Sequence, residues 1–156
     1  MDRYPMTPDG QKKLTAELKH LREVDRPANV KAIEEALAHG DLKENAEYKA
    51  AKEQQSIIAG RIEYLEDRIS RAEIIDPTKL SGDRIVFGAR VTMENLATEE
   101  EVTYRIIGED EANLDSGTIS ITSPIARGLI GKEVGDIAVI GTPSGPKKFE
   151  IVDVEF

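Results

Sequence analysis

Two rows of residues seven apart run through Tyr48-Lys-Ala-Ala-Lys-Glu-Gln-Gln-Ser-Ile-Ile-Ala-Gly-Arg-Ile-Glu-Tyr-Leu-Glu-Asp-Arg-Ile-Ser-Arg-Ala72. Interleaved, the rows give the four-three spacing that is typical of a coiled-coil seam. The first row is Tyr48, Gln55, Ile62 and Ile69, and the second is Ala51, Ile58, Leu65 and Ala72. This stretch is therefore predicted to form one long helix that packs along its seam against a partner.

The residues before it supply that partner. Thr7-Pro8-Asp9 is a typical helix start, because threonine can cap the helix and proline fits its first position. The apolar stripe that follows is Leu14, Leu18 and Leu21, and it resumes in a shifted phase after Pro27 as Val30, Ile33 and Leu37. We expect one helix with a kink at Pro27, since proline removes a donor and clashes one turn back. A true break at Pro27 is the alternative.

A tight turn at His39-Gly40 joins the two predicted helices. Each helix has roughly thirty residues and would be about 45 Å long at about 1.5 Å per residue. Two helices joined by so short a turn must run antiparallel and pack along their seams. Residues 1–77 are thus predicted to form an antiparallel coiled-coil hairpin with its turn at the far end.

The periodicity changes after Asp76-Pro77, and Thr78 to Asp83 is a short linker. The β-rich segments beyond it are 84–93, 101–107, 117–122, 137–140 and 148–154. Thr142-Pro-Ser-Gly-Pro is a predicted turn between the last two, and Pro124 to Ile130 a short helix. Residues 78–156 are therefore predicted to form a small, mainly antiparallel β domain, which makes the chain an α+β protein of two domains.

The amino-acid composition excludes several classes of function. The 156 residues carry a net charge of −9, which argues against a protein that coats duplex DNA. Cysteine and tryptophan are absent, so the chain has no disulfide, thiolate nucleophile or cysteine-based zinc site. The N-terminus has no signal-peptide pattern and no stretch is long enough to span a bilayer. We expect a cytoplasmic protein that does not bind membranes and acts as a monomer.

The turn between the helices carries two acids, Asp41 and Glu44. On local rules Asp41 could simply cap the second helix, with Glu44 at the third position completing a reciprocal cap. A cap does not require so long a hairpin, however, and the i, i+3 spacing lets both carboxylates lie on one face. Mg²⁺ prefers six oxygen ligands, so two carboxylates could only complete a site that another macromolecule supplies in part.

Two segments resemble a known family. His39-Gly-Asp-Leu-Lys-Glu-Asn-Ala-Glu-Tyr-Lys-Ala-Ala-Lys-Glu-Gln-Gln55 resembles the tip signature of the Gre transcript cleavage factors, most closely their GreA members. Ser123-Pro-Ile-Ala-Arg-Gly-Leu-Ile-Gly-Lys132 is similar to the C-terminal signature of the same family, and Pro5-Met-Thr7 also fits. The resemblance covers nearly the whole chain.

The resemblance implies a bacterial elongation factor that is not itself an enzyme. In that family the coiled coil enters the secondary channel of RNA polymerase, and the C-terminal domain, FKBP-like in fold, docks at the channel rim. The tip acids, here Asp41 and Glu44, help hold the second Mg²⁺ of the polymerase, and no Mg²⁺ is bound tightly by the factor alone. The polymerase then cleaves the 3′ end of its backtracked nascent RNA. By motif match the docking residues are Ser123, Pro124, Ile125, Ala126 and Arg127.

The family also carries a basic patch on the hairpin that contacts the extruded RNA, and Lys49 and Lys52 occupy such positions. Leu37 stands where relatives are often basic, which indicates a small patch of the GreA type. A solvated helix face is the alternative for both lysines. Tyr48 lies on the seam, so packing is favoured over nucleotide contact, and His39 is interpreted as a turn residue.

Two other functions remain open. A factor that occupies the channel and inhibits without stimulating cleavage would share this architecture, although its acidic tip would differ. The FKBP-like resemblance also raises prolyl isomerase activity. That activity is disfavoured because the C-terminal half offers only Phe87, Tyr104, Phe149 and Phe156 to line an aromatic pocket.

Overall fold

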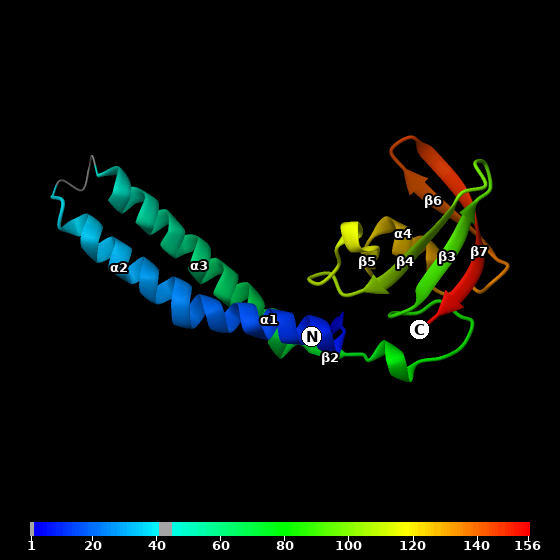
Figure 1. Cartoon of the computed structure of the whole chain (residues 1–156), viewed down its shortest axis with the longest axis horizontal. Coiled ribbons are helices and arrows are strands. Elements are labelled where there is room, and N and C mark those ends of the chain that lie inside the picture. The colour runs from blue at the N-terminus through cyan, green and yellow to red at the C-terminus, as the bar shows by residue number, and fades with distance from the viewer. Residues whose placement is uncertain (1, 41–44) are drawn as a thin grey trace. The chain divides into compact units, whose positions relative to one another are not determined.

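The structure is a computed structural model of the 156-residue chain, and it describes residues 2–40 and 45–156. The chain divides into two compact units (Figure 1). One unit comprises Lys12–Arg71 and is a helical hairpin. The other combines Met1–Gln11 with Ala72–Phe156 and contains the β-sheets. The predicted α+β class, a helical hairpin followed by a mainly antiparallel β domain, is confirmed.

The first arm of the hairpin is a continuous run of helical residues. It consists of α1 (Pro8–His20), a π-helical segment (Leu21–Asp25) and α2 (Arg26–Leu37). The predicted start is confirmed, because Pro8 is the first helical residue and Thr7 Oγ1 accepts a hydrogen bond from the Gly10 N–H at 3.0 Å. The alternative of two separate helices that break at Pro27 is excluded, since Asp25 and Arg26 both keep right-handed helical dihedrals.

The irregularity in this arm precedes Pro27 and has a definite form. The Arg26 N–H bonds to the Leu21 carbonyl, which is the i to i−5 pattern of a π-helix. A π turn holds one residue more than an α turn, so every seam position after it moves by one residue. The predicted stripe after Pro27 is accordingly right only at Ile33, which is half-buried, and wrong at Val30 and Leu37. Asn29 and Ala36 are buried, whereas Val30 and Leu37 are each 46% exposed.

The second arm, α3 (Ala46–Ser70), follows the predicted seam closely. Its buried residues are Ala51, Ile58, Ile62 and Leu65, and Tyr48 and Ile69 are half-buried. Gln55 is the exception, because it is exposed at a seam position. Figure 1 shows α3 lying beside α2, and the buried Asn29 Nδ2 donates to the Ala51 carbonyl between them at 2.9 Å.

Ion pairs also join the two arms. The Arg61 guanidinium donates two hydrogen bonds to the Glu17 carboxylate, at 2.6 and 2.9 Å, and Arg22 pairs with Glu66. The bond from Arg61 and its positive charge lower the pKa of Glu17, although partial burial of the carboxylate opposes the change. Exposed pairs of this kind contribute little stability each. They do favour antiparallel pairing in this register.

The other unit contains two sheets. β1 (Tyr4–Met6) pairs in parallel with β2 (Ala72–Ile74), the segment that follows α3. This pairing, which the sequence analysis did not foresee, groups residues 1–11 with the β-rich half. The two compact units therefore meet at residues 11/12 and 71/72, whereas a single boundary at 77/78 was predicted from the sequence. A 3₁₀ turn, Pro77–Lys79, lies at the start of the predicted linker.

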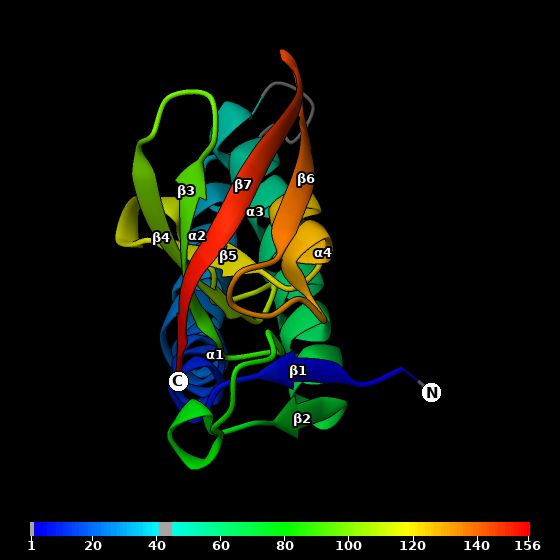
Figure 2. The same ribbon diagram turned by 90° about the vertical axis from the view of Figure 1, so that its right-hand side faces the viewer.

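The larger sheet has the order β5-β4-β3-β7-β6. Its strands are β3 (Arg90–Asn95), β4 (Glu101–Ile107), β5 (Thr118–Ser120), β6 (Ile137–Thr142) and β7 (Gly145–Glu155). All neighbours are antiparallel except β4 and β5, which are parallel. A second 3₁₀ turn, Leu114–Ser116, precedes β5. Figure 2 shows the long β7 lying between β3 and β6.

The β prediction for 84–93 is only partly right. Strand pairing begins at Arg90, while Arg84 forms an isolated bridge with Glu133. Gly88, with φ of 91°, turns the chain between them, and its N–H donates to the Ile106 carbonyl at 2.7 Å. Ile85 and Phe87 are buried although they lie outside any strand.

One hydrophobic core stabilises this sheet. It includes the side chains of Ile85, Ala89, Val91, Met93, Ile106, Ile119, Ala126, Leu129, Ala138, Ile140, Ile151 and Val154. The short helix α4 (Pro124–Leu129) contributes two of them and packs against β6. Tyr104, Phe149 and Phe156 pack against the same core, so these aromatic side chains are used in folding. Within the described residues, no helix is long and apolar enough to cross a membrane.

Candidate functional site at the hairpin turn

Asp41 and Glu44, the predicted metal ligands, lie outside the described residues. The chain on either side of them is described. α2 ends at Leu37, and Gly40 has φ of 98°, a left-handed conformation that glycine adopts without strain. α3 begins at Ala46. The two acids therefore belong to the short connection between two antiparallel helices, as the sequence predicted from its turn at His39-Gly40.

Asn45 links the two helix ends beside this connection. Its Oδ1 accepts from the Tyr48 N–H at 3.0 Å, which makes it the N-cap of α3. Its Nδ2 donates to the Ala36 carbonyl in the last turn of α2 at 2.6 Å. One side chain thus satisfies an orphan donor of α3 and a carbonyl of α2. Asn45 directly precedes α3 and is a favoured capping residue, so capping rules could have identified it.

The cap of α3 is therefore Asn45 and not Asp41. The alternative that explained Asp41 and Glu44 as the capping pair of the second helix does not hold for α3.

His39 and Glu47 form a second link across the connection. His39 Nδ1 lies 3.0 Å from Glu47 Oε2, although both side chains are well exposed. His39 was predicted to be a turn residue only. Its partner Glu47 could not be predicted from local sequence, because the two residues lie on opposite sides of the turn. An exposed pair of this kind is weak, and it is an ion pair only when the histidine is protonated.

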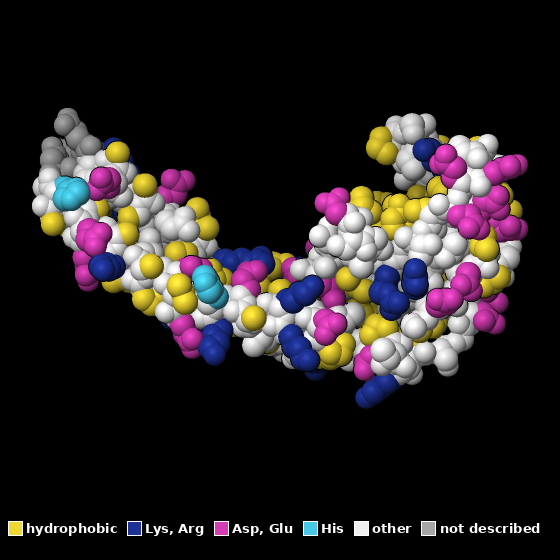
Figure 3. Space-filling model, viewed as in Figure 1, with side chains coloured by type: hydrophobic (Ala, Val, Ile, Leu, Met, Phe, Trp, Pro, Cys, Tyr) yellow, Lys and Arg dark blue, Asp and Glu magenta, His cyan; other side chains and the backbone are white. Residues whose placement is uncertain are grey.

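The predicted RNA-contacting lysines lie on the first turns of α3, and both are exposed. Lys52 Nζ donates to Gln55 Oε1 on its own helix at 2.7 Å, and Lys49 lies one turn nearer the connection. Figure 3 shows acidic and basic side chains interspersed along the visible face of the hairpin. Both lysines are thus available to a partner, and the solvated-face alternative remains. Tyr48 is half-buried, which agrees with packing.

The predicted docking segment forms the start of α4. Ser123 Oγ accepts from the Ala126 N–H at 3.2 Å and caps the helix, and Pro124 lies in its first turn. Ala126 is fully buried, whereas Pro124 and Arg127 are exposed. A partner could therefore reach Pro124 and Arg127 directly, while Ala126 would act by holding the helix against the core.

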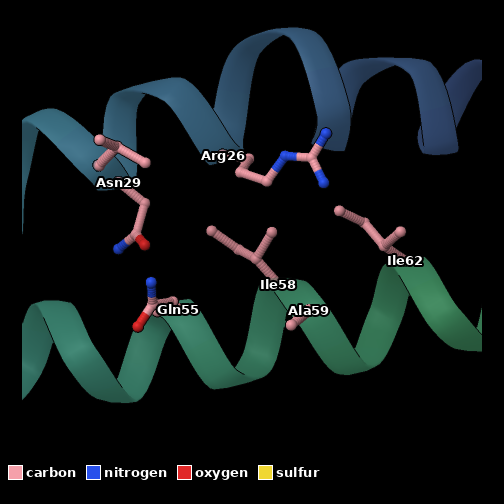
Figure 4. A pocket seen from close by; sticks show the side chains of 7 residues that line it. Arg26, Asn29, Gln55, Ile58, Ala59 and Ile62 are labelled. Carbon is pink, nitrogen blue, oxygen red and sulfur yellow. The ribbon is translucent and has the colours of Figure 1, made fainter.

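One pocket of about 280 Å³ lies in the hairpin, where the π-helical segment passes into α2 (Figure 4). Its lining residues are Arg26, Asn29, Val30, Gln55, Ile58, Ala59 and Ile62. They include no carboxylate and no nucleophile, so the pocket has no catalytic set. Within the described ranges 2–40 and 45–156, no group of three His, Cys, Asp or Glu residues could hold a metal ion.

Comparisons with known proteins agree over the whole chain. Residues 4–74 match the family model "Transcription elongation factor, N-terminal", and residues 80–156 match "Transcription elongation factor, GreA/GreB, C-term". The chain is 54% identical to the transcription elongation factor GreA of Hyphomonas neptunium and 55% identical to that of Beijerinckia indica. Each alignment covers 100% of this chain and 99% of the relative.

Solved structures are also similar. The Gfh1 protein of Thermus thermophilus, titled a GreA factor homolog, is 30% identical with a TM-score of 0.45, over 99% of this chain and 100% of that one. A GreA/GreB factor from Nitrosomonas europaea is 18% identical with a TM-score of 0.44, and the match covers 100% of both chains. The two family models together span both units of the chain. The chain therefore belongs to the GreA/GreB family of transcription elongation factors and is most like GreA.

Proposed function

We propose that this elongation factor binds bacterial RNA polymerase in the cytoplasm and stimulates the polymerase to cleave backtracked nascent RNA. The observation that carries the proposal is the pair Asp41 and Glu44 on a closed hairpin end whose second helix is already capped by Asn45. Two carboxylates three residues apart, in the connection between two antiparallel helices, suit presentation to a partner.

The donor set fits Mg²⁺ that is shared with another site. Carboxylate oxygens are the ligands that Mg²⁺ prefers, but two of them cannot fill six positions. Polymerase acids and the RNA phosphate would supply the remaining oxygens. When bound, the ion activates water and stabilises the charge that develops at the phosphate. Asp41 and Glu44 would hold it there, and the factor by itself would perform no reaction.

The other predicted residues extend this arrangement. Lys49 and Lys52 are exposed on the first turns of α3, so they could contact the phosphates of the extruded RNA 3′ end. Pro124 and Arg127 are exposed on the capped helix α4 and would contact the rim of the polymerase channel, with Ser123, Ile125 and Ala126 supporting them. Binding through two separate surfaces would raise the effective concentration of the tip at the active site.

A transcript-cleavage assay tests the proposal. Backtracked polymerase complexes carrying end-labelled RNA are mixed with the wild type, with Asp41→Asn, with Glu44→Gln, or with Glu35→Gln, an exposed acid near the end of α2, as a matched control. We expect the wild type and Glu35→Gln to shorten the RNA, and the Asp41→Asn and Glu44→Gln variants to bind without shortening it. Equal cleavage by wild type and Asp41→Asn would refute the role of the tip. A wild type that slows synthesis without cleavage would instead identify a channel-blocking factor.

A further inference from the structure

The carboxylate of Glu111 lies on the first turn of α1 and is held there by several hydrogen bonds. Its Oε2 accepts from the Thr7 N–H at 2.8 Å and from the Gly108 N–H at 3.1 Å. Its Oε1 accepts from the Thr7 hydroxyl. That hydroxyl oxygen in turn accepts from the Gly10 N–H. A negative charge is also favoured at this end of a helix by the helix dipole.

Two glycines make room for the carboxylate. A Cβ built on Gly10 would lie 2.5 Å from the Glu111 Cδ and 2.6 Å from its Oε1. A Cβ built on Gly108 would lie 2.7 Å from Oε2 and also 2.7 Å from the Pro5 carbonyl oxygen. Such separations are shorter than van der Waals contact, so either side chain would displace Glu111. The absence of a side chain at both Gly10 and Gly108 is therefore required for the Glu111 carboxylate to lie here.

The hydrogen bonds of Glu111 to Thr7 and Gly108 are called the clamp below. The clamp lies on the helix through which the chain passes from one unit to the other. α1 runs from Pro8 to His20, but its residues up to Gln11 belong to the unit that contains the β-sheets. From Lys12 onward the same helix belongs to the hairpin. Glu111 thus fixes, within the β-sheet unit, the root of the helix that continues as the first arm of the hairpin. The β1–β2 pairing fixes the chain at the return of the second arm.

We propose that Glu111 is a positioning residue: it clamps the first turn of α1 and thereby restricts the directions in which the hairpin extends from the β-sheet unit. The expected effect of the clamp on RNA cleavage rests on the proposed function. A factor that docks through α4 and acts through its hairpin turn must satisfy both contacts at once. A freely moving root would lower the effective concentration of the tip acids at the polymerase active site.

Distance measurements between two spin labels test the clamp without polymerase. The chain contains no cysteine, so Ser56→Cys and Lys147→Cys can be labelled uniquely, one in each unit. We expect Glu111→Ala and Gly10→Ala each to widen the distance distribution relative to the unmodified background. Gly60→Ala, a helical glycine with open space at its Cβ, is the matched control and should leave it unchanged. A label pair within the hairpin, Glu35→Cys with Ser56→Cys, should give the same distribution in every variant.

The same variants are then compared at saturating concentration in the cleavage assay. A mislocated catalytic group can cost up to ~10²-fold in rate, and we expect a loss of roughly threefold or more for Glu111→Ala and Gly10→Ala. Unchanged distance distributions in both variants would overturn the clamp. Widened distributions with wild-type cleavage would overturn its positioning role. If wild type itself gives no cleavage, the proposed function fails, while the distance result still decides the clamp.

Discussion

Replacing Gly10 with alanine is expected to destabilise the protein, although alanine is the better helix former. On helix propensity alone the change should stabilise an exposed helical position by up to about 1 kcal/mol. The new methyl group, however, would occupy the space of the Glu111 carboxylate, 2.5 Å from its Cδ. The flexible side chain can move away, but it then leaves its three donors, the Thr7 N–H, the Thr7 hydroxyl and the Gly108 N–H.

The magnitude follows from those hydrogen bonds. A hydrogen bond to a charged group contributes about 1.5–3 kcal/mol, and water would replace part of this at a half-buried site. Losing the set should cost roughly 2–3 kcal/mol. After subtracting the gain in helix propensity, we expect a net loss of about 1–2 kcal/mol in the free energy of unfolding.

The assay is urea unfolding of a double-mutant cycle, followed by circular dichroism. In the Glu111→Ala background the obstacle is gone, so Gly10→Ala should change sign and become stabilising. Gly60→Ala, which meets nothing within 4 Å, should be stabilising by about 0.5–1 kcal/mol in either background. If Gly10→Ala stabilises the wild type as Gly60→Ala does, the reasoning about Glu111 is refuted.

Two further predictions concern the hairpin. Asn45→Ala should lower the free energy of unfolding by about 1–2 kcal/mol, since it removes both the cap of α3 and the bond to Ala36. Asn45→Asp keeps the capping oxygen and should lose about half as much, and equal urea midpoints for the two variants would contradict the double role. The pKa of Glu17 is lowered chiefly by its hydrogen bond from Arg61. The ionised carboxylate should therefore stabilise the hairpin fully at pH values above its unfolded pKa of 4.5. This contribution should be lost as the pH falls through the lowered pKa of the folded state. Glu17→Gln should therefore cost only a few tenths of a kcal/mol at pH 7 because the pair is exposed, and less at low pH or high salt. A difference between Glu17→Gln and wild type that grows on acidification would contradict this sign.

Much of the hairpin could be predicted from sequence because its pattern is local. The heptad rows of α3 predicted the buried Ala51, Ile58, Ile62 and Leu65, and the proline and threonine at the start predicted the first helical residue. The strand 101–107 was likewise predicted with its observed bounds. These features depend on residues close in sequence: periodicity determines which face of an element is apolar, and the capping residues determine where a helix begins.

The errors arose where one element depends on another. The seam of α2 was predicted wrongly at Val30 and Leu37 because a π turn moves the seam by one residue. Pro27 alone does not reveal whether the helix kinks, breaks or adds a residue. Residues 84–89 were predicted to be part of a strand. The chain turns at Gly88 instead, and the Gly88 N–H donates a hydrogen bond to the Ile106 carbonyl in β4. Local rules allowed Asp41 to cap the second helix, whereas Asn45 caps α3.

By itself, the sequence determined the antiparallel hairpin, the acidic residues Asp41 and Glu44 in its connection, and the family resemblance. Only the tertiary structure decided how the hairpin is rooted. Thr7 and Glu111 are 104 residues apart, and no periodicity relates positions so distant. Their contact depends on the parallel pairing of β1 with β2 and on the space left by Gly10 and Gly108. Such a contact forms only when separate elements pack, because the pattern of each element specifies its own apolar face but not its neighbour.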